Sequence, residues 1–580
     1  MAVDPKTEVE VALRKALREV APELSQFPIA FERPKQAEHG DFACTIALQL
    51  AKPLGRNPRE IAQRLSERTV ALTPSIMALI DAPQVAGPGF INFRLKSGAK
   101  QAVISRVLHE GAEFGSLRPA ARQSVHIEFV SANPTGPLHV GHGRGAAYGA
   151  SLAALLEFAG HDVTREFYIN DAGRQMDILA LSVWLRYLQA HGSVVPFPED
   201  GYRGDYVLRI AARLNDAHVT RFVRDAAALP QPAPGADPDA ALDALIAAAK
   251  RLLGEDWRLV HRFALEDMLA DQRDDLAQFR VEFDRWFSEQ SLYDAGAVER
   301  TVERLASAGH VYEKDGALWF RSSAFGDEKD RVLRRENGQF TYFASDVAYH
   351  AEKLGRGYAR LIDVWGADHH GYIPRVRGAM QALGLDAARL TVTLVQFAVL
   401  YRGGEKVAMG KRSGDFVTLR ELREEVGNDA ARFFYVMRKS DQHLDFDLDL
   451  AKSESQDNPV YYVQYAHARV CSVFAQWGGD PARLAGCPLE PLDSPRELAL
   501  TQRLAEFPEL VQDSARELAP HSVAFYLREL AGEFHSYYNA ERILVEDPAL
   551  RTARLALCAA VRQVLANGLA LLGVDAPEKM

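Results

Sequence analysis

The chain has 580 residues, 47% of them hydrophobic, and a formal net charge of −10. This length is enough for roughly three or four domains of about 150 residues, and the apolar content suffices for buried cores. An acidic balance argues against a general nucleic-acid coating protein, although it leaves room for a local basic groove. No apolar run reaches the roughly 18–20 residues of a membrane span, so no membrane partner is expected.

The four cysteines lie far apart and form no C-x-x-C pair: Cys44, Cys471, Cys487 and Cys558. This spacing argues against a zinc site and against a disulfide framework. The N-terminal residues alternate charged and apolar side chains and lack the apolar segment of a signal peptide. We therefore expect a cytoplasmic protein whose side chains hold no tightly bound metal.

Residues 1–112 are predicted to form a small α+β domain. The segment 8–20 has the 3.6-residue apolar spacing of an amphipathic helix. The segment 84–95 has a Gly-Pro-Gly turn followed by alternating apolar and polar residues, which is typical of a strand.

Residues 113–425 are predicted to form a Rossmann-like α/β domain. A β-rich run at 124–130, a helical pattern at 146–160 and a second β-rich run at 163–169 make a βαβ unit, which favours a parallel sheet. Helical patterns rich in Ala, Leu and Arg then interrupt the sheet between about 180 and 290.

Strand-like runs return after this helical insertion, and we expect them to complete the sheet. They lie at 317–322, 340–343, 360–366 and 391–400. From 426 to 580 the chain is almost entirely amphipathic helix, which predicts a C-terminal all-helical bundle. The predicted fold class is therefore α/β with an N-terminal α+β domain and a C-terminal bundle.

The most informative motif runs from Glu128 to Gly149. It joins a strand to a helix through a loop rich in Pro and Gly, and His139 and His142 flank Val-Gly at the helix start. A helix N-terminus presents free N–H groups and a positive dipole end, which suit a phosphate. Gly141 allows a nucleotide to approach the backbone closely.

This motif has two other interpretations. It partly matches a dinucleotide-binding fingerprint. That fingerprint, however, has its first glycine directly after the strand, whereas here ten residues separate Val130 from Gly141. Its acidic residue ends the next strand, whereas Asp162 precedes that strand. Alternatively, the histidines are ordinary capping or core residues. The pairing of two histidines with Pro134 and Gly136 favours a functional site.

A second motif lies at 403–419, where a Gly-rich loop carries Lys406, Lys411 and Arg412. It is not a phosphate-binding P-loop, because five residues instead of four separate its glycines and Arg412 replaces the required Ser or Thr. A solvated basic loop is the other interpretation.

The first motif, HVGH at 139–142, resembles the HIGH signature of class I aminoacyl-tRNA synthetases, and 408–412 resembles their KMSKS loop. The loop keeps Lys411 but departs at Ala408, Gly410 and Arg412. These departures leave the individual roles of the three cations Lys406, Lys411 and Arg412 undecided.

Acidic residues near the predicted sheet edge bear on the choice of amino acid. A guanidinium group offers five fixed donors and a permanent charge, so its pocket needs carboxylates. Glu128 lies on the first predicted strand, just before the loop rich in Pro and Gly. Asp346 follows Tyr342 by four residues, which places Tyr342 and Asp346 on one face if their segment is helical. The other interpretation makes Glu128 and Asp346 ordinary ion-pair partners.

The segments 128–149, 165–176, 197–207, 364–376 and 458–469 resemble arginyl-tRNA synthetases of the bacterial type, and the likeness covers nearly the whole chain. The resemblance implies arginine-binding positions at Glu128, Ser131, Asn133, Tyr342 and Asp346. It implies ATP-handling positions at His139, Gly141, His142, Asp368, His369, Met409 and Lys411. Among these, His139, His142 and Lys411 are the expected catalytic residues.

The resemblance also implies the reaction and its partners. Arginine and ATP, with Mg²⁺ on its phosphates, would form arginyl-adenylate, from which arginine passes to tRNA(Arg). The N-terminal domain would contact the tRNA elbow, and the helical C-terminal domain the anticodon. It further implies that activation requires tRNA, and we expect a monomer. The rivals are a class I synthetase for cysteine or glutamine and a non-catalytic tRNA-binding relative.

Overall fold

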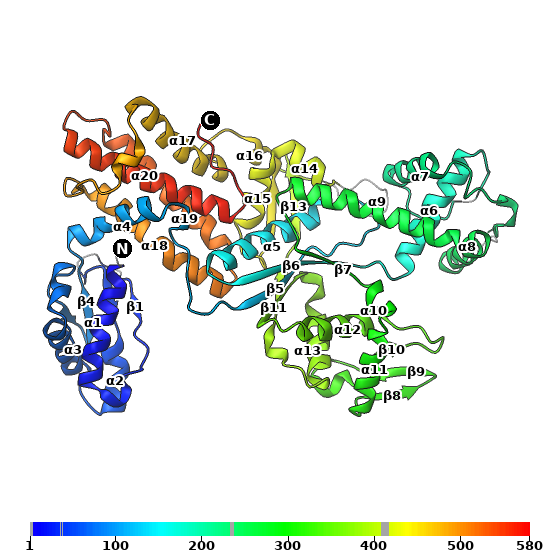
Figure 1. Cartoon of the computed structure of the whole chain (residues 1–580), viewed down its shortest axis with the longest axis horizontal. Coiled ribbons are helices and arrows are strands. Elements are labelled where there is room, and N and C mark those ends of the chain that lie inside the picture. The colour runs from blue at the N-terminus through cyan, green and yellow to red at the C-terminus, as the bar shows by residue number, and fades with distance from the viewer. Residues whose placement is uncertain (1–3, 35, 37–38, 196, 232–236, 408–416) are drawn as a thin grey trace.

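A computed structural model describes residues 4–34, 36, 39–195, 197–231, 237–407 and 417–580. A parallel sheet lies at the centre of an elongated molecule (Figure 1). The N-terminal domain lies at one end, the C-terminal helices lie above and beside it, and two lobes project at the opposite end.

The N-terminal domain packs helices against a four-stranded antiparallel sheet of order β1-β2-β4-β3. The helices are α1 (Pro5–Val20), α2 (Ile46–Leu54) and α3 (Pro58–Leu72). The strands are β1 (Phe31–Glu32), β2 (Phe42–Cys44), β3 (Gln84–Ala86) and β4 (Phe90–Phe93). The apolar stripe expected at 8–20 is buried through Val9, Leu13 and Leu17, as an amphipathic helix requires.

The central sheet has five parallel strands in the order β12-β11-β5-β6-β7. They are β5 (Ser124–Glu128), β6 (Asp162–Ile169), β7 (Arg285–Ser288), β11 (Arg360–Gly366) and β12 (Leu390–Val395). The βαβ unit expected from the sequence is confirmed, with α5 (Val140–Phe158) joining β5 to β6. Helix α5 is apolar almost all round, because it lies between the sheet and the C-terminal helices.

The described part of the region expected as a helical insertion contains four α-helices and one strand. They are α6 (Arg174–Ala190), α7 (Asp205–His218), α8 (Pro238–Leu253) and α9 (Asp256–Gln278), with a core of their own around Trp184. The strand β7 also falls within 180–290, yet it pairs with β6 in the central sheet. A four-residue strand gives too short a pattern to be recognised among long helices.

Three of the runs expected to complete the central sheet depart from that expectation: one lies in another sheet, one joins the central sheet only in its first part, and one is helical. The run at 317–322 supplies β9 (Ala317–Phe320), which pairs with β8 (Val311–Lys314) and β10 (Arg331–Arg334) in a separate antiparallel sheet. The run at 391–400 is divided between β12 and β13 (Ala398–Arg402), because the Gln396 N–H turns to the Ser440 carbonyl.

The third of these runs, 340–343, begins a helix instead of a strand. Thr341 has extended backbone angles and caps α12 (Tyr342–Gly355). The helical alternative considered for Tyr342 and Asp346 is therefore correct. Together with α10 (Gln290–Asp294), α11 (Ala297–Ser307) and α13 (Ile373–Ala382), α12 builds the lower lobe that carries β8–β10 (Figure 1).

Residues 426–580 are mostly helical, as expected. A small sheet of order β14-β13-β15 leads into this region, with β14 at Glu405–Lys406 and β15 at Leu444–Asp447. The helices are α14 (Leu419–Val426), α15 (Asn428–Val436), α16 (Leu448–Lys452), α17 (Pro459–Trp477), α18 (Pro495–Glu517), α19 (His521–Ala540) and α20 (Pro548–Leu571). Helix α4 (Ser97–Glu110) packs against α18 and α20.

Helix α20 is long and apolar enough to cross a membrane by composition, but 78% of its most apolar window is buried inside the protein. Its neighbours are α4, α17, α18 and α19. Burial against other helices accounts for its apolar surface, so α20 is the central helix of the bundle.

Candidate active site

A cleft of about 1010 Å³ opens at the carboxyl edge of the central sheet. Ligand sites of open parallel sheets form at this edge, where the loops that follow the strands meet. The cleft is lined by seven residues that the sequence singled out: Ser131, Asn133, His139, Gly141, His142, Asp368 and His369. The structure therefore brings together the first motif and the segment after β11, which are more than 200 residues apart.

The two histidines cap the first turn of α5. His139 is the N-cap residue, and its Nδ1 accepts the Gly141 N–H at 3.0 Å. The Nδ1 of His142 accepts the His139 N–H at 3.2 Å, and the two ring centroids lie 3.7 Å apart. The capping interpretation of these histidines is thus correct, and it is compatible with a functional role.

Capping fixes the chemistry that each ring offers to the cleft. Because Nδ1 accepts a hydrogen bond, a neutral ring carries its proton on Nε2. Burial, reinforced by the neighbouring His139, lowers the pKa of His142 to about 3, so His142 is neutral at physiological pH. His142 can therefore act as a hydrogen-bond donor without adding a charge.

Gly141 is required by the same arrangement. A Cβ atom at this position would lie 2.7 Å from Cε1 of His139 and 3.3 Å from Phe397. Any other residue would push the capping ring away from the helix.

The chain that follows the second motif is fixed beside this helix start. The Val140 N–H donates to the Val417 carbonyl at 3.1 Å, and the Leu419 N–H donates to the Leu138 carbonyl at 2.9 Å. Val417 also lines the cleft. Met409 and Lys411, together with Arg412, lie outside the described residues.

The turn after β5 has a backbone that sequence reasoning missed. Val130 has φ of +66° and Ser131 φ of +41°, a region that is rare for residues other than glycine and unfavourable for a β-branched one. This turn directs the Ser131 hydroxyl back to Glu128 Oε1, at 3.0 Å. The same hydroxyl accepts the Tyr168 N–H at 3.1 Å. The strained turn therefore places Ser131 so that its hydrogen bonds join the ends of β5 and β6 next to the cleft.

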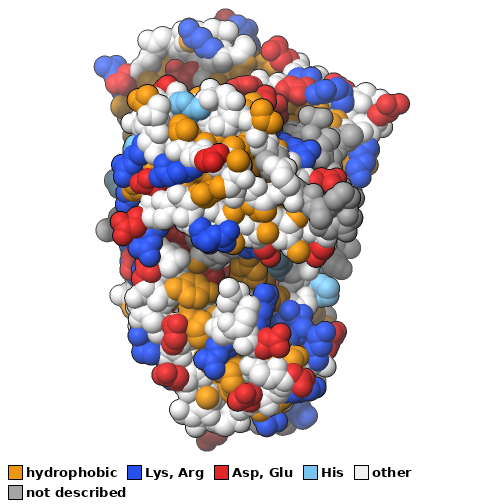
Figure 2. All heavy atoms as spheres, turned by 90° about the vertical axis from the view of Figure 1, so that its right-hand side faces the viewer, with side chains coloured by type: hydrophobic (Ala, Val, Ile, Leu, Met, Phe, Trp, Pro, Cys, Tyr) orange, Lys and Arg blue, Asp and Glu red, His pale blue; other side chains and the backbone are white. Residues whose placement is uncertain are grey.

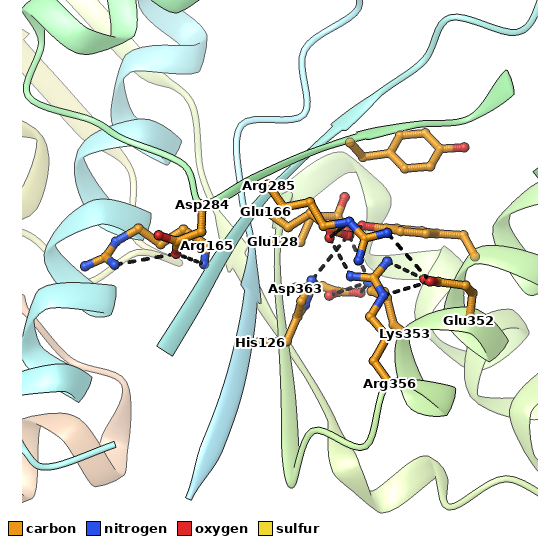
Figure 3. A network of polar contacts seen from close by, with 12 residues as sticks. His126, Glu128, Arg165, Glu166, Asp284, Arg285, Glu352, Lys353, Arg356 and Asp363 are labelled. Atoms are coloured by element: carbon orange, nitrogen blue, oxygen red, sulfur yellow. Dashed lines mark hydrogen bonds and ion pairs between the residues drawn. The ribbon is translucent and has the colours of Figure 1, made fainter. Parts of the chain in front are cut away.

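Glu128 belongs to a buried network of ion pairs (Figure 3). Lys353, which is fully buried, donates to Glu128 Oε2 at 2.8 Å and to both Asp363 oxygens at 2.8 and 3.0 Å. Burial lowers the pKa of Lys353, but the two carboxylates outweigh it and the pKa is raised. The ion-pair interpretation of Glu128 is correct, and its other oxygen still faces Ser131.

Helix α12 carries a polar stripe toward the sheet. Tyr342, Asp346, His350 and Lys353 follow one another at spacings of four, four and three residues, so they lie on one face. His350 Nε2 lies 2.9 Å from Asp363 Oδ2. This periodicity of polar residues was present in the sequence and could have identified Lys353 and His350.

The two predicted arginine-binding residues of α12 differ in their surroundings. Asp346 Oδ2 accepts the Tyr372 hydroxyl at 2.5 Å, and burial raises the pKa of Asp346 while this hydrogen bond opposes the rise. The Tyr342 side chain is 52% exposed, and its hydroxyl lies over Gly173 at the start of α6. Neither Asp346 nor Tyr342 forms an ion pair among the described residues.

A second buried carboxylate, Glu166, locks the sheet below the site (Figure 3). It accepts hydrogen bonds from Arg356 and from the Tyr349 hydroxyl, at 2.5 and 2.6 Å, and pairs with His126 at 3.3 Å. Burial would raise the pKa of Glu166, but these partners lower it to about 2. Glu166 thus fixes α12 against β6.

The loop that carries Asn133 is supported from the insertion. Gln272 of α9 is fully buried and donates through Nε2 to the Asn133 carbonyl at 3.0 Å and to the Gly136 carbonyl at 2.9 Å. The Asn133 amide oxygen accepts the Asn170 side chain at 3.2 Å. Asn133 is therefore oriented by elements on both sides of the cleft.

The surface near the insertion has no single sign of charge. Figure 2 shows basic and acidic side chains interspersed at the end of the molecule that carries α6–α8 and β8–β10, with a hollow between the two lobes.

On α17 and α19 the guanidinium of Arg469 lies 4.7 Å from the ring centroids of both Tyr465 and Tyr538. These residues belong to the C-terminal helices, which the resemblance implied would contact the anticodon.

Three family models match successive parts of the chain. "Arginyl tRNA synthetase N terminal domain" matches residues 7–95. "tRNA synthetases class I (R), catalytic domain" matches 103–197 and 250–449, and "DALR anticodon binding domain" matches 463–580.

Full-length relatives agree with these matches. The chain is 63% identical to an arginine–tRNA ligase of Aromatoleum aromaticum and 61% identical to one of Azoarcus sp., each alignment covering 100% of both chains. Among solved structures, Thermus thermophilus arginyl-tRNA synthetase superposes with a TM-score of 0.73 at 25% identity, covering 98% of this chain and 99% of that one.

Proposed function

Because the chain belongs to the arginyl-tRNA synthetase family, and so uses ATP to charge tRNA with arginine, we propose how its residues divide that work. The first turn of α5, with His139 and His142, binds the ATP phosphates, and the acidic pocket beside β5 and α12 binds the arginine side chain. The observation that carries this proposal is the contact between the two sites, through Ser131 and Glu128.

In the first step, a carboxylate oxygen of arginine attacks the α-phosphorus, and the bond to the β-phosphate oxygen breaks. Arginyl-adenylate forms and pyrophosphate leaves. The reaction needs positioning and charge stabilisation more than a protein nucleophile. The Nε2–H groups of His139 and His142 and the dipole of α5 provide neutral donors for the developing charge, and Lys411 provides a cation. We propose that Mg²⁺ arrives on the ATP phosphates.

The proposed arginine site uses carboxylates of different character. Glu128 is neutralised in part by Lys353, whereas the side chain of Asp346 accepts a hydroxyl and forms no ion pair with any residue that the structure describes. A guanidinium would therefore complete the charge balance at Asp346, with Tyr342 covering it. Ser131 and Asn133 lie between this pocket and the cleft, where the α-amino and carboxylate groups would bind.

We further propose the division into residues 1–112 for the tRNA elbow, 113–425 for catalysis and 426–580 for the anticodon. The attack by the ribose hydroxyl of the terminal adenosine would take place at the carboxyl edge of the sheet. All proposed arginine and ATP residues come from one chain, so a monomer would suffice. We propose that it works in the cytoplasm.

The test is ATP–pyrophosphate exchange with each amino acid, with and without total tRNA. We expect exchange with arginine alone, dependent on tRNA. Exchange with cysteine or glutamine would overturn the pocket assignment, and exchange with no amino acid would favour a non-catalytic tRNA-binding protein.

An Asp346→Asn variant should raise the KM for arginine far more than the KM for ATP. Equal effects on the two KM values would contradict the proposed arginine site.

A further inference from the structure

Arg144 is a buried cation in the second turn of α5, where it is 1% exposed. Its Nη1 donates to the Gln396 carbonyl at 2.8 Å and to the Gln442 carbonyl at 2.7 Å, and its Nη2 donates to the Lys439 carbonyl at 2.9 Å. In the part of the chain that the structure describes, Arg144 forms no ion pair. Its hydrogen bonds therefore join α5 to two loops that lie more than 250 residues further along the chain.

The first of these loops forms a wall of the cleft. Gln396 stands between Val395 and Phe397, and both of these neighbours line the cleft. The Gln396 carbonyl is held by Arg144, and the Gln396 N–H donates to the Ser440 carbonyl at 2.9 Å. Because both backbone groups of Gln396 are bonded, the two cleft residues beside it are fixed in position.

Phe397 reaches the start of α5. Its side chain is 46% exposed, which is unusual for so large an apolar group. A Cβ atom at Gly141 would lie 3.3 Å from the Phe397 ring, so Phe397 closes over the same backbone that the capping histidines hold. An exposed aromatic ring at the mouth of a cleft offers a flat apolar surface to a ligand.

The second loop supports the first. Lys439 and Gln442 precede β15, which runs parallel to β13 with Leu444 opposite Ala398. Helix α5 contacts β13 directly, and α15, which leads to the second loop, packs along α5 (Figure 1). Arg144 therefore binds both loops at the point where β13 and β15 begin.

The residue type matches this task. Burial lowers the pKa of Arg144 to about 10, so a buried charge is maintained at physiological pH. A planar guanidinium holds several acceptors in a fixed geometry, which a single ammonium group cannot reproduce. An apolar side chain of similar volume would fill the space without the cost of burying a charge. The three carbonyl bonds are what the charged group adds.

We propose that Arg144 is a positioning residue for ATP, which fixes the Gln396 backbone and thereby holds Val395 and Phe397 against the first turn of α5. This inference rests on the ATP site proposed above. Arg144 acts through the wall of the cleft and is not itself a ligand of the nucleotide.

The test is the kinetics of ATP–pyrophosphate exchange by the full-length Arg144→Lys enzyme with tRNA present. Lysine keeps the charge but cannot occupy the places of both Nη atoms. We expect the KM for ATP to rise about tenfold and the rate at saturating ATP to fall about tenfold, since small displacements in a reacting geometry are costly. The KM for arginine should stay within about twofold of that of the unaltered enzyme.

The matched control is Arg432→Lys. Arg432 of α15 is also 1% exposed, and burial lowers its pKa to about 10 as well. It likewise donates to three backbone carbonyls, those of Phe279, Arg280 and Leu572, and none of these residues lines the cleft. Arg432→Lys should lower the urea midpoint as much as Arg144→Lys does, while leaving the KM for ATP unchanged.

Equal changes in the KM values for ATP and arginine in Arg144→Lys, or the same ATP KM in Arg144→Lys and Arg432→Lys, would overturn the inference. If Arg144→Lys does not fold, Arg144→Gln replaces it with the same expectations, because a neutral amide donates to a carbonyl without burying an unpaired charge. Failure of the proposed function looks different, because the unaltered enzyme would then show no exchange with arginine.

Discussion

At the scale of the residue, the proposed active site depends on side chains whose hydrogen bonds leave one defined atom available to a ligand. In His139 and His142, Nδ1 accepts a backbone N–H at the start of α5. The Nε2–H of each ring is therefore left to donate into the cleft. Glu128 divides its two oxygens between Lys353 and Ser131. Such fixed groups need no reorganisation when charge develops, which is the main source of electrostatic stabilisation in a closed site.

His142 should make the local stability of α5 depend on pH. Its pKa is lowered to about 3 by burial, while the unfolded chain keeps the ordinary value of 6.5. Between these values the unfolded state binds more protons, so the free energy of opening rises with pH and levels off above 6.5. From pH 7 to pH 5 we expect a loss of about 2 kcal/mol, measured by hydrogen exchange of α5 amides.

A His142→Gln variant should lose this dependence, since glutamine does not titrate. His443→Gln, at an exposed position, is the matched control and should keep it. An equal loss of stability in His142→Gln between pH 7 and pH 5 would mean that another group is responsible.

At the scale of the element, α5 is positioned by close contact with the strand end before it. Gly149 faces Phe129, and a Cβ atom there would lie 2.3 Å from the Phe129 ring. Gly145, one turn earlier on the same helix, has nothing within 4 Å of its Cβ position. Helix and strand therefore approach one another only where glycine permits it.

Gly149→Ala should destabilise the protein by about 1–3 kcal/mol through overpacking, despite the better helix propensity of alanine. Gly145→Ala is the control on the same helix, and it should be neutral or stabilising by up to about 1 kcal/mol. The measurement is the urea midpoint of the catalytic domain. Equal effects of the two substitutions would show that helix propensity alone decides.

At the scale of the whole molecule, the N-terminal domain meets the C-terminal bundle across a groove of about 970 Å³. Among the described residues, two ion pairs cross it, Lys6 with Glu509 at 2.7 Å and Arg33 with Glu506. Both lie at the surface, where an ion pair is worth at most about 1 kcal/mol and is screened by salt. The position of this domain should therefore respond to ionic strength.

A Glu506→Gln/Glu509→Gln variant should have a larger radius of gyration than the unaltered protein at low salt, measured by small-angle scattering. In 1 M salt, where the Debye length is about 3 Å, the two should converge. Glu517→Gln serves as the control, because Glu517 is on the same helix and its one ion pair in the described part of the chain is with Arg516. A radius unaffected by the double substitution would mean that apolar contacts alone hold the domain.

The sequence by itself determined the fold class, the βαβ unit, the paired histidines at the start of α5 and the family. These depend on local periodicity and on motifs that need no distant partner. It did not determine which sheet a short strand joins, as 317–322 and 285–288 illustrate, because pairing partners are chosen by packing between segments far apart in the chain.

Tertiary structure alone decided how the carboxylates of the site are used. Glu128 and Asp346 come from two separate elements, and nothing local distinguishes the acid that pairs with Lys353 from the one that accepts the Tyr372 hydroxyl. The strained turn at Val130 and Ser131 is likewise invisible in the sequence, since both residues ordinarily avoid positive φ. The fold imposes these environments because burial, which sets the charge state of each acid, is a property of the assembled protein.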